Sequence, residues 1–263
     1  MRNQISKLLF FLCMLTVIAG CSRRQPANIN AEQAHNPLSA HIIAPGMGTI
    51  GLISNEILEI YFPEDIRRWA PDETSRFAIP QPNHGILAVG MGTLGVIEKD
   101  VLRFYRLDTS NQWARLAWGD FNIPGKYDRV IAMKMPWEMG VLGLEHEGMV
   151  DFYFYYDGNW QMDPSATFMI PNGIDSYYPL GDMTMAVIQG NKLGIYYLGP
   201  EEGWEFLDHD SFVLLLPDDH QAIIPYEPGK IAVLVNHDLQ FFQLDLLEDR
   251  WIKLADLEFN LPR

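Results

Sequence analysis

Histidine and carboxylate side chains gather in short polar segments between apolar runs, which makes them the first candidates for chemistry. Imidazole and carboxylate groups together suit Zn²⁺ and similar ions. No His-x-x-x-His or Asp-x-Asp-x-Asp spacing occurs, so ligands would have to converge from distant segments, and we predict no metal site. The alternatives are a solvated surface or one that binds a partner. This candidate binding set is His84, Asp128, Glu145, His146, Asp175, Asp219, His220, His237 and Asp238.

Methionine forms a second recurring set. Met47, Met91, Met135 and Met183 occupy the same place after an apolar run, where the corresponding fifth segment has Glu227. Thioethers can hold soft Cu(I), they adapt to varied protein partners, and they fill gaps in a core. All three interpretations stay open for this candidate contact ring.

Enzymatic motifs are harder to find. Glycoside hydrolysis needs two carboxyl groups about 5–9.5 Å apart, one of them with a raised pKa. No Asp or Glu flanked by apolar residues stands out in the apolar runs that open each repeat, such as Ile86-Leu-Ala-Val89. Neither a Gly-x-Ser-x-Gly elbow nor a phosphate-binding loop occurs in the sequence. We therefore predict no catalytic residue.

The N-terminal segment has the pattern of a targeting signal. Arg2 and Lys7 precede an apolar stretch from Leu8 to Ile18, which is too short to span a bilayer and has the layout of a signal peptide. The segment Ile18-Ala-Gly-Cys21 resembles the lipobox of bacterial lipoproteins. The resemblance implies cleavage after residue 20, lipidation of Cys21 and a membrane anchor through its acyl chains. Ser22 in place of Asp favours the outer membrane, with the domain facing the periplasm or the cell surface.

The cysteine count and the charge are consistent with this predicted location. The second cysteine, Cys13, would leave with the signal peptide, so no thiol and no disulfide would remain. The formal net charge of −15 becomes more negative by two units once Arg2 and Lys7 are removed. A surface this acidic repels nucleic acid, which we exclude as a partner, and leaves basic proteins, neutral glycans and cations. Residues 21–40 are polar and are predicted to be the lipidated cysteine and a flexible tether.

Internal repeats predict the fold of the remaining chain. Five segments, residues 41–83, 84–128, 129–175, 176–220 and 221–263, each hold three short runs rich in Val, Ile, Tyr and Phe, followed by a tryptophan. Most then close with Phe-x-Ile-Pro or Phe-x-Leu-Pro. The tryptophans in register are Trp69, Trp113, Trp160, Trp204 and Trp251.

Short β-prone runs separated by polar turns indicate an all-β domain. Four antiparallel strands in about 45 residues are typical of a propeller blade, so the repeats predict a five-bladed β-propeller over residues 41–263. The strand order is similar to that of kelch-type and related propellers. The recurring Trp and Phe are expected to pack between neighbouring blades. In such a ring the candidate binding set and the methionines lie on opposite faces.

These observations predict an envelope lipoprotein that binds a macromolecule through one propeller face, and we expect this partner to be a protein of an envelope or secretion complex. A lectin with one sugar pocket per blade is the alternative, and a glycoside hydrolase a weaker one. No cofactor is expected apart from the lipid on Cys21.

Ring closure is the last expectation. Each repeat supplies its own four strands, so the first and last blades should meet through side chains alone. We expect Leu52, Ile60 and Trp69 to contact Val233, Phe241 and Trp251. Such an unlatched seam should open before other junctions, and the tether should not contribute to closure.

Overall fold

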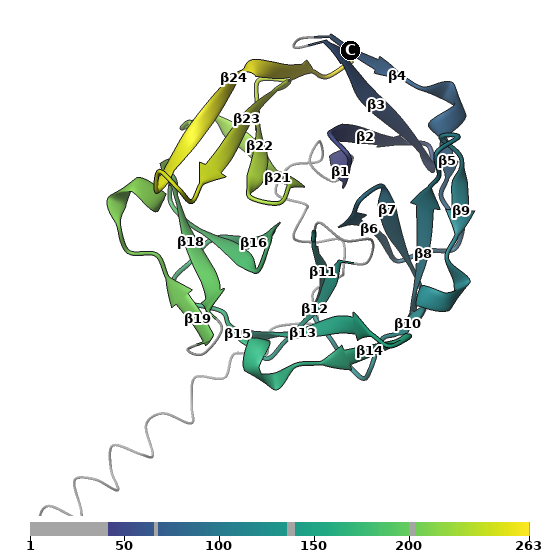
Figure 1. Ribbon diagram of the computed structural model, residues 1–263, viewed down its shortest axis with the longest axis horizontal. Coiled ribbons are helices and arrows are strands. Elements are labelled where there is room, and N and C mark those ends of the chain that lie inside the picture. The colour runs from purple at the N-terminus through teal and green to yellow at the C-terminus, as the bar shows by residue number, and fades with distance from the viewer. Residues whose placement is uncertain (1–41, 66–67, 136–139, 200–202, 263) are drawn as a thin grey trace, which may run out of the picture.

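Five antiparallel sheets surround a central axis in the computed structural model, which describes residues 42–65, 68–135, 140–199 and 203–262 (Figure 1). Each sheet is built from consecutive strands, with the first strand next to the axis and the last at the rim. This arrangement confirms the predicted five-bladed propeller. Cys21, residues 1–41 and Arg263 lie outside the described residues, and so do the predicted signal peptide and tether.

The strands and 3₁₀ turns follow the repeat. Blade 1 contains β1 (Ile42–Gly46), β2 (Thr49–Ser54), β3 (Ile57–Asp65), β4 (Arg68–Pro71), η3 (Glu73–Ser75) and β5 (Phe77–Ala78). Blade 2 contains β6 (Gly85–Gly90), β7 (Thr93–Glu98), β8 (Val101–Leu107), β9 (Trp113–Arg115), η4 (Ala117–Gly119) and β10 (Phe121–Asn122). Blade 3 contains β11 (Arg129–Met133), β12 (Val141–His146), β13 (Met149–Tyr156), β14 (Asn159–Met162), η5 (Pro164–Ala166) and β15 (Phe168–Met169).

The last two blades differ from each other at the rim. Blade 4 contains β16 (Ser176–Gly181), β17 (Thr184–Gln189), β18 (Lys192–Gly199), β19 (Gly203–Phe206), η6 (Asp210–Phe212) and β20 (Leu214–Leu215). Blade 5 contains β21 (His220–Glu227), β22 (Lys230–Val235), β23 (Asp238–Asp245) and β24 (Arg250–Asn260). In blades 1–4 a 3₁₀ turn divides the predicted fourth strand in two, and both pieces pair with the third strand. In blade 5 this strand stays extended and bulges between Lys253 and Glu258.

The tryptophans form a repeated bridge between blades. Each indole N–H donates to a backbone carbonyl of the preceding blade, and in four cases the acceptor lies in the 3₁₀ turn. The pairs are Trp113 with Ser75, Trp160 with Gly119, Trp204 with Ala166, Trp251 with Phe212 and Trp69 with Glu258, at 2.7–2.9 Å. Trp69 therefore joins blade 1 to blade 5 in the same way that the chain-linked blades are joined. The side chains are half-buried between sheets, as predicted.

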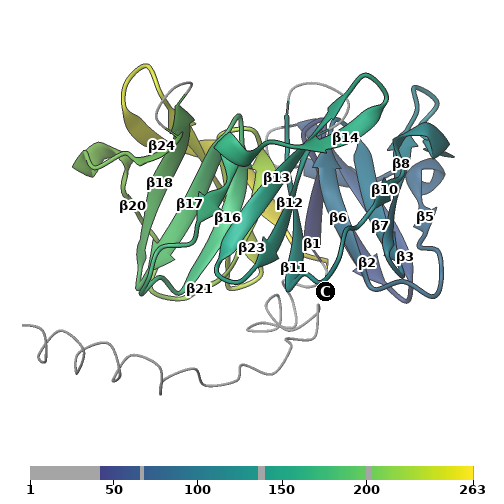
Figure 2. The ribbon, with the colours of Figure 1, turned by 90° about the horizontal axis from the view of Figure 1, so that it is seen from below.

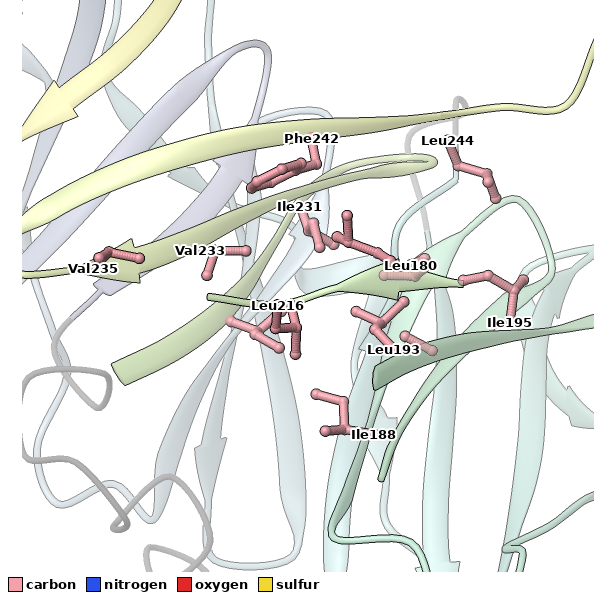
Figure 3. Close-up of a cluster of buried hydrophobic side chains, with 13 residues drawn as sticks. Leu180, Ile188, Leu193, Ile195, Leu216, Ile231, Val233, Val235, Phe242 and Leu244 are labelled. Carbon is pink, nitrogen blue, oxygen red and sulfur yellow. The ribbon is translucent and has the colours of Figure 1, made fainter. Parts of the chain in front are cut away.

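The core is divided into layers between neighbouring blades. Figure 3 shows the layer between blades 4 and 5, where Leu180, Leu193 and Ile195 meet Ile231 and Val233. The closing phenylalanines of the repeat are buried as well: Phe77, Phe121, Phe168 and Phe259 are at most 6% exposed. Alternate residues of each strand enter the layers on its two sides.

The seam between blades 1 and 5 corrects part of the prediction on ring closure. Leu52, Trp69 and Phe241 belong to its core, as expected. Ile60 instead packs toward blade 2, while Val233 and Trp251 pack toward blade 4. The reason is strand alternation: Tyr61, the neighbour of Ile60, is the residue of β3 whose side chain faces the seam.

The ring has two distinct faces, seen from the side in Figure 2. We call one the polar face; it carries the connections between blades and the turns between second and third strands. The other, the methionine face, carries the turns between first and second strands and between third and fourth strands. Because β1 starts on the polar face, the chain enters the domain there, beside the axis. Leu261 donates its N–H to the His237 carbonyl, so the described chain also ends on that face.

Candidate functional site

The candidate binding set lies along the polar face, spread over blades 2 to 5. His84, Asp128 and Asp175 immediately precede the innermost strands of their blades, and Glu145 and His146 end β12. Asp219 precedes β21, and His220 is its first residue. His237 and Asp238 lie at the turn between β22 and β23, where His237 has a φ of 80°. The fold thus places the set on one face without gathering it into one cluster.

Several carboxylates of this face stabilise its turns. Asp175 accepts the N–H of Gly190 at 2.6 Å, and Asp219 accepts the Asn236 amide at 2.7 Å. Each bond ties the connection that enters a blade to the turn between the second and third strands of the same blade. These carboxylates therefore act first as turn supports, a common use of Asp in loops.

Glu145 sits in a compact charged cluster between blades 3 and 4. Its Oε2 accepts hydrogen bonds from Arg129 Nε at 3.0 Å and from the Tyr177 hydroxyl at 2.5 Å. The Arg129 guanidinium also stacks over the Tyr177 ring, 4.2 Å from its centroid. Burial raises the pKa of Tyr177, so the phenol stays protonated and remains a donor. The cluster joins two blades and has the composition of a structural ion pair.

Two histidines of the set have local partners as well. His146 Nε2 lies 2.7 Å from Asp151 Oδ2, and Thr167 donates to the other oxygen of Asp151. His220 Nδ1 lies 2.8 Å from the Pro217 carbonyl. Across the described ranges, no group of three or more His, Cys, Asp or Glu side chains is arranged to hold a metal ion.

The methionines of the candidate contact ring have unlike surroundings. Met47 and Met91 are 58% and 41% exposed at the tips of left-handed turns. Met183 is half-buried against the layer between blades 3 and 4, and Met135 is 3% exposed within that layer. Met47 and Met91 sit in adjoining turns, because a Cβ on Gly46 would come within 2.8 Å of the Met91 nitrogen. Two of the four are thus accessible, side by side.

The methionine face carries further exposed apolar side chains. Tyr156 is 57% exposed at the end of β13, and Leu246 and Leu247 are 51% and 97% exposed in the turn between β23 and β24. Sequence reasoning missed both leucines. The available signal was an apolar pair at a position where the corresponding turn of blade 2 has Thr109 and Ser110.

A buried lysine occupies the axis near this face. Lys134 donates to the carbonyls of Pro225 and Tyr226, so it spans from blade 3 to blade 5. Burial lowers its pKa to about 7, and the neighbouring Glu227 carboxylate opposes that shift. Lys134 and Glu227 stand where blades 1, 2 and 4 have Gly46, Gly90 and Gly181. The register corrects the predicted contact ring, because Glu227 does not take the methionine position in blade 5 and Asp182, not Met183, takes it in blade 4. A pair of opposite charges in a repeated glycine position is the signal by which the sequence could have revealed it.

The small residues of the same turns let the blades converge on Lys134. A Cβ on Gly181 would lie 2.5 Å from the Lys134 carbonyl, and one on Gly90 would lie 3.5 Å from its Cα. Asp182, whose pKa is raised by burial, donates its N–H to the Lys134 carbonyl. These contacts make the axis a packed region at the methionine face.

None of the helices in the described ranges is long and apolar enough to cross a membrane. A hollow of about 590 Å³ lies open at the rim of the seam, between Pro63 of blade 1 and the bulge of β24.

The comparisons with known proteins concern the fold. No protein-family model matches the chain, and no curated protein matches its sequence. Among solved structures, a functionally unknown protein from Desulfotomaculum acetoxidans is 14% identical with a TM-score of 0.41, covering 83% of this chain and 68% of that one. A protein from Bacteroides fragilis, provisionally named a 6-phosphogluconolactonase, is 12% identical with a TM-score of 0.41, covering 81% and 68%. Hsv2 from Kluyveromyces marxianus is 11% identical with a TM-score of 0.35, covering 82% and 83%.

Proposed function

We propose that this chain is a lipid-anchored protein of the bacterial outer membrane that binds a macromolecular partner, a protein of an envelope or secretion complex, through its methionine face. The observation that carries the proposal is the exposed apolar set on that face: Met47, Met91, Tyr156, Leu246 and Leu247. Loops held by a rigid scaffold are the usual location of binding residues.

The polar face is a poorer candidate for the partner. Its carboxylates Asp175 and Asp219 already support turns, and Glu145 is shared between Arg129 and Tyr177. The chain also enters the domain on this side, at the start of β1. An anchor on Cys21 would therefore attach from the polar side and leave the methionine face pointing away from the lipid.

The lectin and hydrolase alternatives lose support. A sugar pocket in each blade would need a recurring exposed aromatic, whereas the recurring tryptophans have committed their N–H groups to neighbouring blades. The more exposed Trp118, Tyr156 and Phe206 occupy different positions in their repeats. For hydrolysis, burial raises the pKa of the Asp182 carboxyl group, but the backbone of Asp182 is bonded to the Lys134 carbonyl in the packed region at the axis.

Labelling with palmitate tests the anchor. Changing Cys21 to Ser removes the acyl acceptor, so the variant should stay unprocessed and incorporate no label. Cys13→Ser is the matched control, because it removes the other cysteine and should leave labelling intact. Label on the Cys21→Ser protein would contradict the lipid anchor.

Paired surface variants test the binding face. Met47→Glu with Met91→Glu places two charges on the methionine face at exposed turn positions. We expect it to abolish partner recovery after cross-linking in intact membranes and purification of the tagged protein. His84→Glu with Asp128→Lys, on the polar face, should leave recovery unchanged. The opposite pattern would move the binding site to the polar face.

A further inference from the structure

The turn between β23 and β24 presents two leucines to solvent on a well-defined support. Asp245 Oδ1 accepts the N–H groups of Leu247 at 2.9 Å and Glu248 at 3.2 Å, which fixes the turn from within. Asp249 completes it with a left-handed φ of 51°. Leu246 and Leu247 stand at the tip, and Leu247 is 97% exposed. The tip is thus apolar and internally braced.

Blade 2 shows that the fold does not require an apolar tip. Leu107 and Leu244 both pair with the repeat tryptophan, so Asp108 corresponds to Asp245. Asp108 Oδ1 also accepts two N–H groups of its turn, from Ser110 at 2.8 Å and from Gln112 at 2.9 Å, although this turn is one residue shorter. The two following positions hold Thr109 and Ser110, both exposed. A turn braced by an aspartate therefore carries a polar tip in blade 2 and an apolar tip in blade 5.

The exposed leucines could contribute binding free energy if a partner buried them. Removing a leucine side chain from water when a partner covers it favours binding. A rigid turn loses little conformational entropy when it docks, which favours tight binding. The pair therefore has the properties of an interaction anchor.

Charge identifies the kind of surface that would receive it. Asp245, Glu248 and Asp249 flank the tip, and Arg250 is paired with Glu248. Anionic lipid headgroups would be repelled by this acidic surround, whereas an apolar pocket with a basic rim would be attracted.

We propose that Leu246 and Leu247 form the anchor by which this protein docks into an apolar pocket, rimmed by Lys or Arg, on a partner protein. The proposal rests on the proposed function above and names the part of the methionine face that carries the affinity. Hot-spot behaviour of this kind is usual for a few central residues of an interface.

Site-specific photo-cross-linking in the full, membrane-anchored chain tests it. A benzophenone side chain is placed at Leu247, at Met91 or at His84, and the cross-linked protein is identified by mass spectrometry and purified. We expect the adduct at Leu247. The purified partner should bind this protein about 10- to 100-fold more weakly when the tip is changed to that of blade 2, by Leu246→Thr with Leu247→Ser. Thr109→Ala with Ser110→Ala is the matched control and should not change affinity.

The other outcomes separate the two proposals. Adducts at Met91 with none at Leu247, or unchanged affinity of the tip variant, would overturn the anchor and leave the proposed function standing. Adducts at His84 alone, or none at any position, would overturn both. Flotation with vesicles of phosphatidylcholine and phosphatidylglycerol, lost in the tip variant, would show a lipid target and overturn the protein pocket. So would tip-dependent self-association in sedimentation.

Discussion

The seam between blades 1 and 5 and the junction between blades 2 and 3 are built alike, although the chain links only the second. Trp69 donates to the Glu258 carbonyl at the seam, and Trp160 donates to the Gly119 carbonyl at the junction, both at 2.9 Å. Trp69 stacks on Phe241 at 6.0 Å, and Trp160 stacks on Phe104 at 5.6 Å. The described cores hold twelve buried residues at the seam and nine at the junction. Closure therefore uses the ordinary packing of the repeat.

What differs is the covalent link. Residues 123–128 connect blade 2 to blade 3, and both partners stay close when their packing breaks. No such segment connects blades 1 and 5 within the described residues, so they can move apart once the packing between them breaks. The seam is therefore expected to open first in spite of its larger core.

Removing the bridging tryptophan should have the largest effect. We expect Trp69→Ala and Trp160→Ala each to lower the free energy of unfolding by about 3–5 kcal/mol, since each removes a large aromatic from an inter-blade layer. In hydrogen exchange, Trp69→Ala should expose blades 1 and 5 together, while Trp160→Ala should affect its own junction alone. Melting temperatures within a degree of the wild type would show that these indoles contribute nothing to packing.

Lys134 extends the comparison from the rim to the axis, where it links blade 3 to the non-adjacent blade 5. Its pKa falls from 10.5 to about 7 on folding. Between these two pH values the unfolded chain therefore binds one more proton than the folded chain. Stability due to this residue should thus rise with pH across that window and be constant below it. From about pH 7.5 to about pH 9.5 the wild type should gain about 2 kcal/mol relative to Lys134→Met. Parallel pH profiles in denaturant titrations would contradict a buried, proton-releasing Lys134.

Conservative variants isolate the hydrogen bond of the bridge. Trp69→Phe keeps an aromatic ring but leaves the Glu258 carbonyl without its indole donor, at an expected loss of about 1 kcal/mol. Trp160→Phe should lose the same amount, because the geometry at Gly119 is equivalent. A loss at the junction but none at the seam, in urea unfolding, would mean that the two bridges are not alike.

Deleting residues 22–38 is expected to have the smallest effect. All five sheets are complete within the described residues, so the melting temperature of the domain should not change. If the deletion unfolds the domain or raises exchange in blade 1, the tether takes part in closure.

The repeat made the architecture predictable, but the positions of some individual residues could not be predicted from it. Trp113 and Phe121 recur at fixed distances, so their place between blades followed from the pattern. The side of a strand could not be derived in the same way: Ile60 and Tyr61 are both apolar, and register alone decides that Tyr61 faces the seam. The 3₁₀ turns were missed because short segments such as Glu73–Ser75 resemble any polar turn.

The candidate site was less predictable for a related reason. Loop positions could be assigned to a face, but Asp175 and Asp219 bind turn groups that no spacing reveals. Met135 shares its repeat position with the exposed Met47 yet is buried, in a turn where Lys134 takes the place of the glycine before it.

The absence of strand exchange between the first and last blades, within the described residues, bears on how this chain could be rearranged. Ile42 begins β1 at the polar face, Leu261 is bonded to His237 on the same face, and every blade is a self-contained stack of hairpins. A circular permutant that joins these ends and opens the connection before Arg129 keeps all five sheets intact. It would also move the point of lipid attachment around the ring by whole blades. The order of the blades in the permuted sequence would thus set how far around the ring the leucine tip lies from the lipid anchor.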